Sequence, residues 1–358
     1  MFNFIKSLVG AEPYLGVDIG TTSIKIAEIS MGKIRPKLQN YGILESYGHL
    51  ERLNDAIQTN SLKLAEKETA ELLKSILAKL KPKTNYASVS VPSFSAFITL
   101  IELPKMSDAD TAKTVSFQLN QYIPLPASEV ATEWFKVGEK SDEKGFDKQE
   151  ILITSIPNGQ IKRYQNVFNL AGLKLKSLEI ESLSLIRAIV GSDPTPTLLV
   201  DIGARSTNMA VSEKGFLKHN RQTDFSGGSL TQAIANGLNI NARRAEELKK
   251  QKGLLGGRGD YELSTLIFPF LDVIINEADR VRENYDKNNK HKIERVILAG
   301  GGANLLGLDK YFEKQINLPT VVGNPFSKID YPPAIDPFVK DLGPALSVAI
   351  GLGLRKFI

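Results

Sequence analysis

Residues 17–27 and 200–210 of this chain share one sequence pattern. Six of the eleven aligned positions are identical, namely Val, Asp, Ile, Gly, Ser and Ala. At ordinary residue frequencies about one identity in eleven would be expected. In each copy an apolar run ends in Asp-Ile-Gly, a short polar stretch follows, and a second apolar run begins. The pattern predicts a strand, a tight turn and a strand in each half, and therefore two related lobes.

Composition excludes several classes of site. The 358 residues include no cysteine, which excludes disulfides, thiolate metal sites and cysteine nucleophiles, and the three histidines are far apart in the sequence. The net charge of +5 comes from 45 basic and 40 acidic residues of interspersed sign. The densest basic stretch, residues 243–258, contains Glu246 and Glu247, so it predicts a solvated helix face and no nucleic-acid partner. Weak attraction to anionic lipid stays open.

The sequence predicts a cytoplasmic protein. No apolar run approaches the ~18–20 residues that span a bilayer, and residues 1–10 are too short for a signal peptide. Their apolar side chains fit one helical face, which predicts a docking turn, with membrane or partner contact as the alternative.

The expected organisation has five parts. Residues 1–92 form lobe 1 (subdomain 1A), residues 93–177 an inserted α+β subdomain, residues 178–197 an inter-lobe helix of 1A, residues 198–340 lobe 2 (2A/2B), and residues 341–358 a C-terminal helix returning to 1A. Strands are expected at 14–19, 23–29, 34–44, 87–91, 97–103, 130–137, 150–156, 173–178 and 295–299. Helices are expected at 62–80, 108–122, 159–171, 181–190, 228–237, 242–252, 261–284, 303–316 and 343–354. Residues 138–149 are expected to be a charged loop.

The first Asp-Ile-Gly turn has the chemistry of a phosphate site. Small residues at Gly20, Thr21 and Thr22 let backbone N–H groups and hydroxyls converge on one anion. Asp18 suits a hydrated Mg²⁺, and Lys25 on the following strand can reach back to the phosphates as a point charge.

The second Asp-Ile-Gly turn offers matching groups from the other half of the chain. Asp201 and Gly203 stand where Asp18 and Gly20 stand in the first copy. A single turn of this type is compatible with a plain hairpin, but two copies at corresponding places favour a clamp on a nucleotide triphosphate.

A third glycine-rich segment follows the strand at residues 295–299. Gly300, Gly301 and Gly302 would let an adenosine lie against the backbone. A dinucleotide-binding fingerprint would need glycine where Leu305 stands. The sequence also lacks the phosphate-loop, zincin and hydrolase motifs.

These motifs together resemble the superfamily of actin, heat-shock chaperone and sugar kinase ATPases. Within it the chain resembles the PilM family of type IV pilus assembly proteins, relatives of the division protein FtsA. The resemblance spans nearly the whole chain and includes residues 16–25, Gln-Tyr-Ile-Pro-Leu-Pro at 121–126, 201–203, 226–231, 245–249 and 349–355. It implies an α/β, bilobed actin-like ATPase fold, built from two ribonuclease-H-like lobes, with the insertion as subdomain 1C.

The resemblance also implies the residues of the site. Asp18 and Asp201 would hold Mg²⁺ through water and act with Glu181 as the catalytic group. The nucleotide-binding residues would be Gly20, Thr21, Thr22, Lys25, Gly203, Ser206, Gly227, Glu246, Lys249, Gly300, Gly301, Gly302 and Asn304. Glu246 and Lys249 would contact ribose and adenine.

The roles of Glu181 and Arg205 each have an alternative. Glu181 stands where the superfamily orients the attacking water, and Ser182 replaces the proline that commonly follows in the family, so a surface salt bridge is the competing role for Glu181. Arg205, where relatives often have small residues, could contact phosphate or form an outward salt bridge. At most slow ATPase activity is implied.

The function implied is a cytoplasmic scaffold of the pilus machinery at the cytoplasmic face of the inner membrane. It would bind ATP with Mg²⁺, hold the N-terminal cytoplasmic tail of PilN between 1A and 1C, and couple nucleotide state to assembly of the inner-membrane platform through other platform proteins. Weak self-association is compatible with this function. The alternative is an FtsA-like membrane-associated filament, although only three residues follow Arg355. A small-molecule kinase is a third hypothesis, for which no sugar-binding insertion or base is visible.

Overall fold

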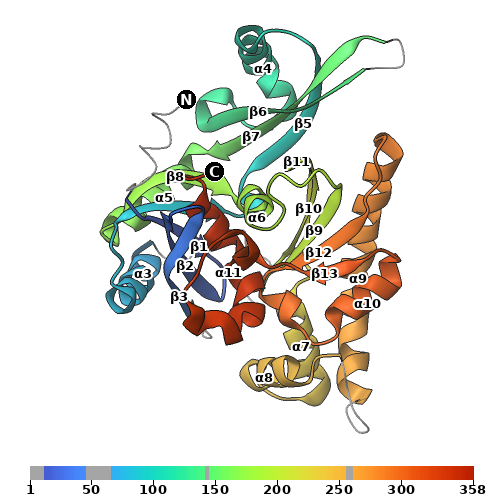
Figure 1. The fold of residues 1–358 in the computed structure, drawn as a ribbon. Coiled ribbons are helices and arrows are strands. Elements are labelled where there is room, and N and C mark those ends of the chain that lie inside the picture. The colour runs from blue at the N-terminus through green and yellow to red at the C-terminus, as the bar shows by residue number, and fades with distance from the viewer. Residues whose placement is uncertain (1–11, 46–65, 142–144, 255–260) are drawn as a thin grey trace.

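The computed structural model describes residues 12–45, 66–141, 145–254 and 261–358 of the chain (Figure 1). Two five-stranded sheets form the centres of two lobes, and a smaller three-stranded sheet lies above them in this view. The predicted docking turn at residues 1–10 falls outside the described residues, as do residues 62–65 of the helix expected at 62–80.

Lobe 1 contains a sheet of order β3-β2-β1-β4-β8. Its strands are β1 (Tyr14–Ile19), β2 (Ser23–Met31), β3 (Pro36–Glu45), β4 (Tyr86–Val91) and β8 (Lys174–Ile180). Helix α3 (Glu66–Leu80) and helix α5 (Asn158–Leu170) pack against one another and against this sheet. Leu15, Val17 and Ile26 are fully buried between them.

Lobe 2 contains a sheet of order β11-β10-β9-β12-β13. Its strands are β9 (Thr197–Ile202), β10 (Thr207–Glu213), β11 (Phe216–Thr223), β12 (Arg295–Ala299) and β13 (Thr320–Val322). The same lobe contains four helices: α7 (Gly227–Leu238), α8 (Ala242–Lys252), α9 (Tyr261–Asn288) and α10 (Leu308–Ile316). Ile267, Leu271 and Ile274 of α9 are buried against the strands.

The two sheets have the same topology. In each, the first three strands are antiparallel neighbours, and the first strand pairs in parallel with the fourth. Asp18 pairs with Lys25 across the first hairpin, and Asp201 pairs with Asn208 across the corresponding one. The sequence repeat therefore corresponds to a repeat of the fold, and the predicted bilobed actin-like α/β fold is confirmed.

The insertion contains a sheet of order β5-β7-β6, formed by β5 (Phe97–Pro104), β6 (Val130–Ser141) and β7 (Asp147–Pro157). Helix α4 (Asp108–Tyr122) covers it, and its first turn is capped by the Ser107 hydroxyl, which accepts from Asp110 N. The stretch expected to be a charged loop, residues 138–149, is largely the end of β6 and the start of β7, because strand pairing continues to Ser141 and Asp147.

The insertion packs on lobe 2 as well as on lobe 1. Val137 and Leu152 lie in one apolar cluster with Leu199 and Leu217 of lobe 2. A buried ion pair joins Lys218 Nζ of β11 to Glu150 Oε2 at 2.5 Å.

Two boundaries differ from those expected. Helix α5 and strand β8, assigned to the insertion from the sequence, pack in lobe 1, because β8 pairs in parallel with β4 and Phe168 is buried in the core of lobe 1. The chain also returns to lobe 1 before residue 341, since Phe326 and Ile329 are buried there and Leu38 N donates to Asp330 O.

Helix α6 (Glu181–Ile189) and helix α11 (Val339–Leu354) lie between the lobes and pack on one another. The expectation that no apolar stretch approaches the length of a membrane span was wrong, because residues 333–354 are long and apolar enough to cross a bilayer, but most of that stretch is buried inside the protein. Its apolar composition is therefore that of a core helix.

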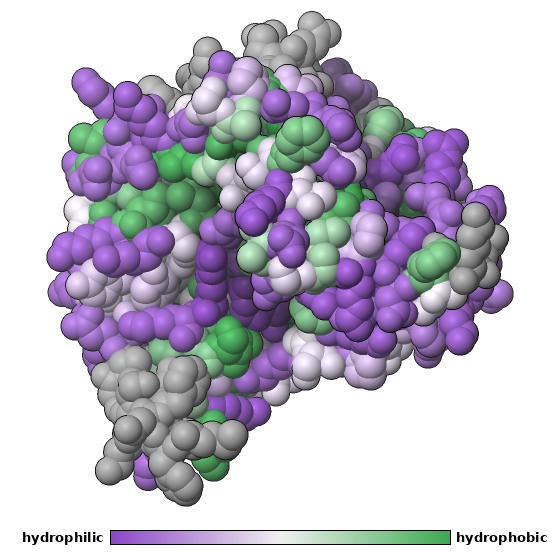
Figure 2. All heavy atoms as spheres, turned by 90° about the horizontal axis from the view of Figure 1, so that it is seen from above, coloured by the Kyte–Doolittle hydropathy of each residue, from purple (hydrophilic) through white to green (hydrophobic). Residues whose placement is uncertain are grey.

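The helix expected at 303–316 is interrupted. A 3-10 turn, η4 (Gly301–Asn304), comes first, and α10 begins only at Leu308, because Gly307 has φ of 83°. Seen from above, hydrophilic and hydrophobic residues are intermixed on the surface, and the hydrophobic ones gather in separate patches (Figure 2).

Candidate nucleotide cleft

A cleft of about 630 Å³ lies between the two lobes. All sixteen residues proposed from the sequence line it: Asp18, Gly20, Thr21, Thr22, Lys25, Glu181, Asp201, Gly203, Ser206, Gly227, Glu246, Lys249, Gly300, Gly301, Gly302 and Asn304. The structure thus brings residues from both ends and the middle of the chain to one place. Their individual roles remain predictions.

The two Asp-Ile-Gly turns have the same backbone geometry. Gly20 N donates to Ser23 O at 2.9 Å, and Gly203 N donates to Ser206 O at 3.0 Å. Each hydrogen bond closes the hairpin directly after the strand that carries the aspartate. Both turns therefore have the same closing hydrogen bond, but the first carries Thr21 and Thr22 where the second carries Ala204 and Arg205.

Asp18 is held by residues of lobe 1. Lys25 Nζ lies 3.0 Å from Asp18 Oδ2, and Ser90 Oγ donates to Asp18 Oδ1 at 2.8 Å. The carboxylates of Asp18, Asp201 and Glu181 raise the pKa of the Lys25 ammonium although its burial opposes this. Lys25 is therefore a fixed positive charge at the floor of the cleft.

Asp201 makes no side-chain hydrogen bond or ion pair with the described residues. Burial, and then the nearby charge of Asp18, raise the pKa of Asp201 to about 6. A bound cation would therefore stabilise the ionised form of Asp201.

Glu181 begins helix α6 and lines the cleft together with the two aspartates. Burial first, and then the charges of Asp201 and Asp18, raise the pKa of Glu181 to about 8. Its Oε1 accepts from Ser93 N at 3.2 Å. Glu181 forms no ion pair with the described residues, so the surface salt bridge considered from the sequence is absent from them.

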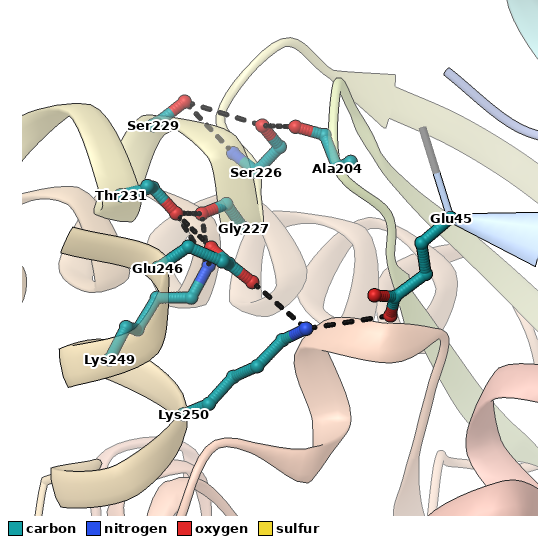
Figure 3. A network of polar contacts seen from close by, with 9 residues as sticks. All are labelled: Glu45, Ala204, Ser226, Gly227, Ser229, Thr231, Glu246, Lys249 and Lys250. Atoms are coloured by element: carbon teal, nitrogen blue, oxygen red, sulfur yellow. Dashed lines mark hydrogen bonds and ion pairs between the residues drawn. The ribbon is translucent and has the colours of Figure 1, made fainter. Parts of the chain in front are cut away.

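Helix α7 begins directly beside the second turn. Gly227 N donates to Gly203 O and Gly228 N donates to Ala204 O, both at 2.9 Å. Ser226 Oγ also donates to Ala204 O at 2.9 Å (Figure 3). The positive end of the α7 dipole therefore lies next to the turn proposed to hold phosphate.

Lys249 and Glu246 of α8 form a buried pair (Figure 3). Lys249 Nζ lies 2.6 Å from Glu246 Oε2 and donates to Gly227 O at 2.8 Å and to Thr231 Oγ1 at 2.7 Å. All three protons of this ammonium are thus used within the protein. A direct contact of Lys249 with adenine would have to come from its aliphatic stem, whereas Glu246 keeps an oxygen toward the cleft.

An ion pair crosses the mouth of the cleft. Lys250 Nζ of lobe 2 lies 3.5 Å from Glu45 Oε1 at the end of β3 in lobe 1, and 3.8 Å from Glu246 Oε1 (Figure 3). The sequence did not single out Glu45 or Lys250.

The three glycines differ in what surrounds them. Gly300 has φ of 77° and ψ of 171°, and a Cβ there would lie 2.3 Å from Asp201 Oδ1. A Cβ on Gly302 would lie 2.4 Å from the Ile202 side chain, whereas one on Gly301 would meet nothing within 4 Å. Gly300 and Gly302 therefore allow close packing, and Gly301 faces open space. Asn304 Nδ2 donates to Asp341 O of α11 at 2.8 Å.

The donor set fits Mg²⁺ held through water and phosphate oxygens better than a metal held by protein alone. No group of three or more acidic or histidine side chains close enough to hold a metal occurs in the part of the chain described. Asp201, however, is a carboxylate without a described partner that faces the cleft.

Sequence reasoning missed some residues of the cleft. Ser90 holds Asp18, and Asn208 donates from Nδ2 to Ser182 Oγ at 2.6 Å. The repeat could have identified Asn208, because it occupies the position of Lys25 in the second copy. Arg205 forms no salt bridge with the described residues, so the outward salt bridge is absent from them, and its guanidinium carbon lies 5.0 Å from the centre of the Phe94 ring.

The comparison with protein families decides the assignment. The profile of the family described as type IV pilus assembly protein PilM matches residues 16–357. The chain belongs to the PilM family. Among curated proteins, a stretch of 154 residues is 26% identical to cell division protein FtsA of Buchnera aphidicola, covering 36% of this chain and 37% of that protein. FtsA of Bacillus subtilis is 32% identical over 85 residues, which cover 23% of this chain and 19% of the relative.

Solved structures show the same fold. A PilM–PilN type IV pilus biogenesis complex matches with a TM-score of 0.79 and 22% identity over 96% of this chain and 98% of that one. MreB 5 of Spiroplasma citri bound to AMPPNP matches with a TM-score of 0.55 and 15% identity over 97% and 96%. EutJ from Carboxydothermus hydrogenoformans matches with a TM-score of 0.55 and 17% identity over 95% and 88%. These likenesses confirm the actin-like fold of this PilM family member.

Proposed function

We propose that this PilM family member is an ATP-binding scaffold for type IV pilus assembly. One observation carries the nucleotide part: two aspartate hairpins, one from each lobe, line a single cleft together with a glycine-rich turn and a helix N-terminus. Actin-like neighbours of similar fold were solved with ADP or AMPPNP bound.

The proposed nucleotide lies with its phosphates between the two turns. Backbone N–H groups of the turns other than those of Gly20 and Gly203 would bind phosphate oxygens. The positive end of the α7 dipole would favour the phosphate charge. Lys25 would neutralise phosphate charge, and Asp18 and Asp201 would hold Mg²⁺ through water. Glu246 would accept from ribose hydroxyls, and Gly301 would leave room for adenosine.

Hydrolysis, where it occurs, would use Glu181 to orient water. The raised pKa of Glu181 leaves it largely protonated at neutral pH until a cation enters the cleft, and a protonated acid does not accept a proton from water. Glu181 would therefore orient water only in the cation-loaded cleft, and at most slow ATPase activity is proposed.

The proposed partner is the N-terminal cytoplasmic tail of PilN, bound between lobe 1 and the insertion. Support comes from family membership and from the PilM–PilN complex among the structural neighbours. The protein would act at the cytoplasmic face of the inner membrane, together with other platform proteins, and nucleotide binding would adjust the groove by moving the lobes.

The competing function is an FtsA-like filament associated with a membrane. The matches to FtsA favour it, but each covers well under half of either chain. Electron microscopy with Mg²⁺-ATP separates the two functions, since abundant ATP-dependent filaments would support the FtsA-like one.

The test of the proposal combines two measurements. Thermal unfolding with and without Mg²⁺-ATP should show stabilisation by ATP in the wild type and none in Asp18→Asn. The matched control Asp309→Asn, on α10 outside the cleft, should respond as the wild type does. A synthetic PilN tail peptide should bind the wild type, and an affinity that does not change among apo, ADP and ATP states would refute the coupling.

A further inference from the structure

Arg205 is a positively charged side chain of the cleft, and no acidic side chain among the described residues forms an ion pair with it. It lies in the second Asp-Ile-Gly turn, lines the cleft, and places its guanidinium over the Phe94 ring at 5.0 Å. It forms no ion pair with the described residues. A guanidinium is attracted more strongly by a phosphate, which it binds through two charged hydrogen bonds, than by an aromatic face.

Phe94 lies at the connection between lobe 1 and the insertion. It belongs to the 3-10 turn η2 (Ser93–Ser95), which directly follows β4 and precedes β5. The Phe94 side chain is 44% exposed although it is aromatic. It lines the nucleotide cleft and also a second cavity of about 630 Å³ against β11.

The 3-10 turn η2 also contacts residues at the start of helix α6. Ser93 N donates to Glu181 Oε1, and Ser93 Oγ lies 3.5 Å from Ser182 Oγ. Residues on both sides of the phosphate region, Glu181 and Arg205, therefore hold η2. A change at either one acts on the segment that leads into the insertion.

The body of the insertion is attached to lobe 2 by other residues. The buried pair between Lys218 and Glu150 and the packing of Val137 and Leu152 fix it against β11. Because the insertion is anchored to lobe 2 and joined through η2 to lobe 1, the conformation of η2 affects how the insertion sits relative to lobe 1.

We propose that Arg205 is a positioning residue that transmits the presence of a terminal phosphate to the insertion through Phe94. With no nucleotide or a nucleoside diphosphate, Arg205 stays on the Phe94 ring and holds η2. With a nucleoside triphosphate, Arg205 moves to the terminal phosphate, η2 is released, and the insertion shifts relative to lobe 1. The inference rests on the proposed function of the cleft and adds the residue that distinguishes triphosphate from diphosphate.

The absence of cysteine from the sequence allows a direct measurement. Ser75→Cys on α3 and Ser116→Cys on α4 place one spin label on lobe 1 and one on the insertion, both at exposed positions. Double electron–electron resonance then gives the distance distribution without nucleotide, with Mg²⁺-ADP and with Mg²⁺-AMPPNP. The affinity for each nucleotide is measured on the same protein by calorimetry.

The expected wild-type result is a distribution that is the same without nucleotide and with ADP, and different with AMPPNP. Arg205→Ala should lose this difference and lower AMPPNP affinity at least about fivefold more than ADP affinity. Phe94→Leu should bind AMPPNP at least as tightly as the wild type, because no Arg205–Phe94 contact has to break. It should show the AMPPNP-like distribution in every state, whereas Phe94→Tyr should respond as the wild type does. Arg221→Ala, on β11 outside the nucleotide cleft, should behave as the wild type.

Four outcomes overturn the inference. If the wild type binds both nucleotides but its distribution does not change, the inference fails while the proposed function stands. If Phe94→Leu responds to AMPPNP as the wild type does, or Arg205→Ala keeps the wild-type ratio of the two affinities, the inference also fails. If the wild type binds neither nucleotide, the inference and the proposed function fail together.

Discussion

Replacing two adjacent glycines, Gly300 and Gly301, by alanine should affect different properties, stability in one case and ATP binding in the other, because only Gly301 has room for a side chain. Gly300 has φ of 77° and ψ of 171°, a region occupied almost only by glycine, and a Cβ there would lie 2.3 Å from Asp201 Oδ1 and 2.5 Å from Ile202 O. The backbone conformation costs about 1–3 kcal/mol, and the overpacking about another 1–3 kcal/mol. We therefore expect Gly300→Ala to lower the free energy of unfolding by about 2–6 kcal/mol.

Gly301→Ala should leave the free energy of unfolding within about 0.5 kcal/mol of the wild type, since its Cβ would meet nothing within 4 Å. If adenosine lies against this backbone, the added methyl overpacks the complex by about 1–3 kcal/mol and weakens ATP binding about 5- to 150-fold. Gly159→Ala, which also has open space but lies on α5, is the matched control.

Urea unfolding of the nucleotide-free variants gives the free energy of unfolding, and calorimetric titration with Mg²⁺-ATP gives the ATP affinity. Wild-type stability in Gly300→Ala would refute the packing argument. Wild-type ATP affinity in Gly301→Ala, with Gly159→Ala also unchanged, would show that adenosine does not lie on the glycine turn.

Three further predictions concern charge. Lys218→Met should destabilise the protein by about 3–5 kcal/mol, because buried Glu150 then keeps only the more distant Lys140, at 3.8 Å, as an ion-pair partner. Adding Glu150→Gln should recover most of this loss in urea unfolding, and an undiminished loss in the double variant would contradict the prediction. The raised pKa values of Glu181 (about 8) and Asp201 (about 6) mean that the folded state keeps protons that the unfolded state releases. The stability of the nucleotide-free protein should therefore fall as pH rises from about 4 to 8, by up to about 1.4 kcal/mol per pH unit for each proton kept, and Glu181→Gln should reduce this slope, so an unchanged slope would contradict the shift. Lys250→Gln should change stability by less than about 1 kcal/mol, less still at high salt, and a larger, salt-independent loss would mean that the pair across the cleft mouth is not solvent-exposed.

The repeated Asp-Ile-Gly pattern predicted the architecture because it is local. Strand, turn and strand are set by alternation and by small residues within about ten positions, and the second copy then implied a second lobe. The same locality placed Gly20 and Gly203 correctly at the two hairpin turns.

Contacts between distant segments were not predictable in this way. Whether α5 belongs to the insertion or to lobe 1 depends on the burial of Phe168 beside α3, and nothing within the α5 sequence specifies that neighbour. The saturation of the Lys249 ammonium by Gly227 and Thr231 likewise depends on how α7 and α8 pack. The contact of Arg205 with Phe94 joins two elements that are far apart in the sequence.

The most direct test of the account is a calorimetric cycle of Mg²⁺-ATP binding with Asp18→Asn, Asp201→Asn and the double variant. If aspartates from both lobes hold one magnesium and triphosphate, each single substitution weakens binding at least about tenfold, which is 1.4 kcal/mol, and the double variant loses less than the sum because the two share one ligand. Wild-type affinity in Asp201→Asn, or losses that add fully, would mean that the two hairpins do not act on the same nucleotide.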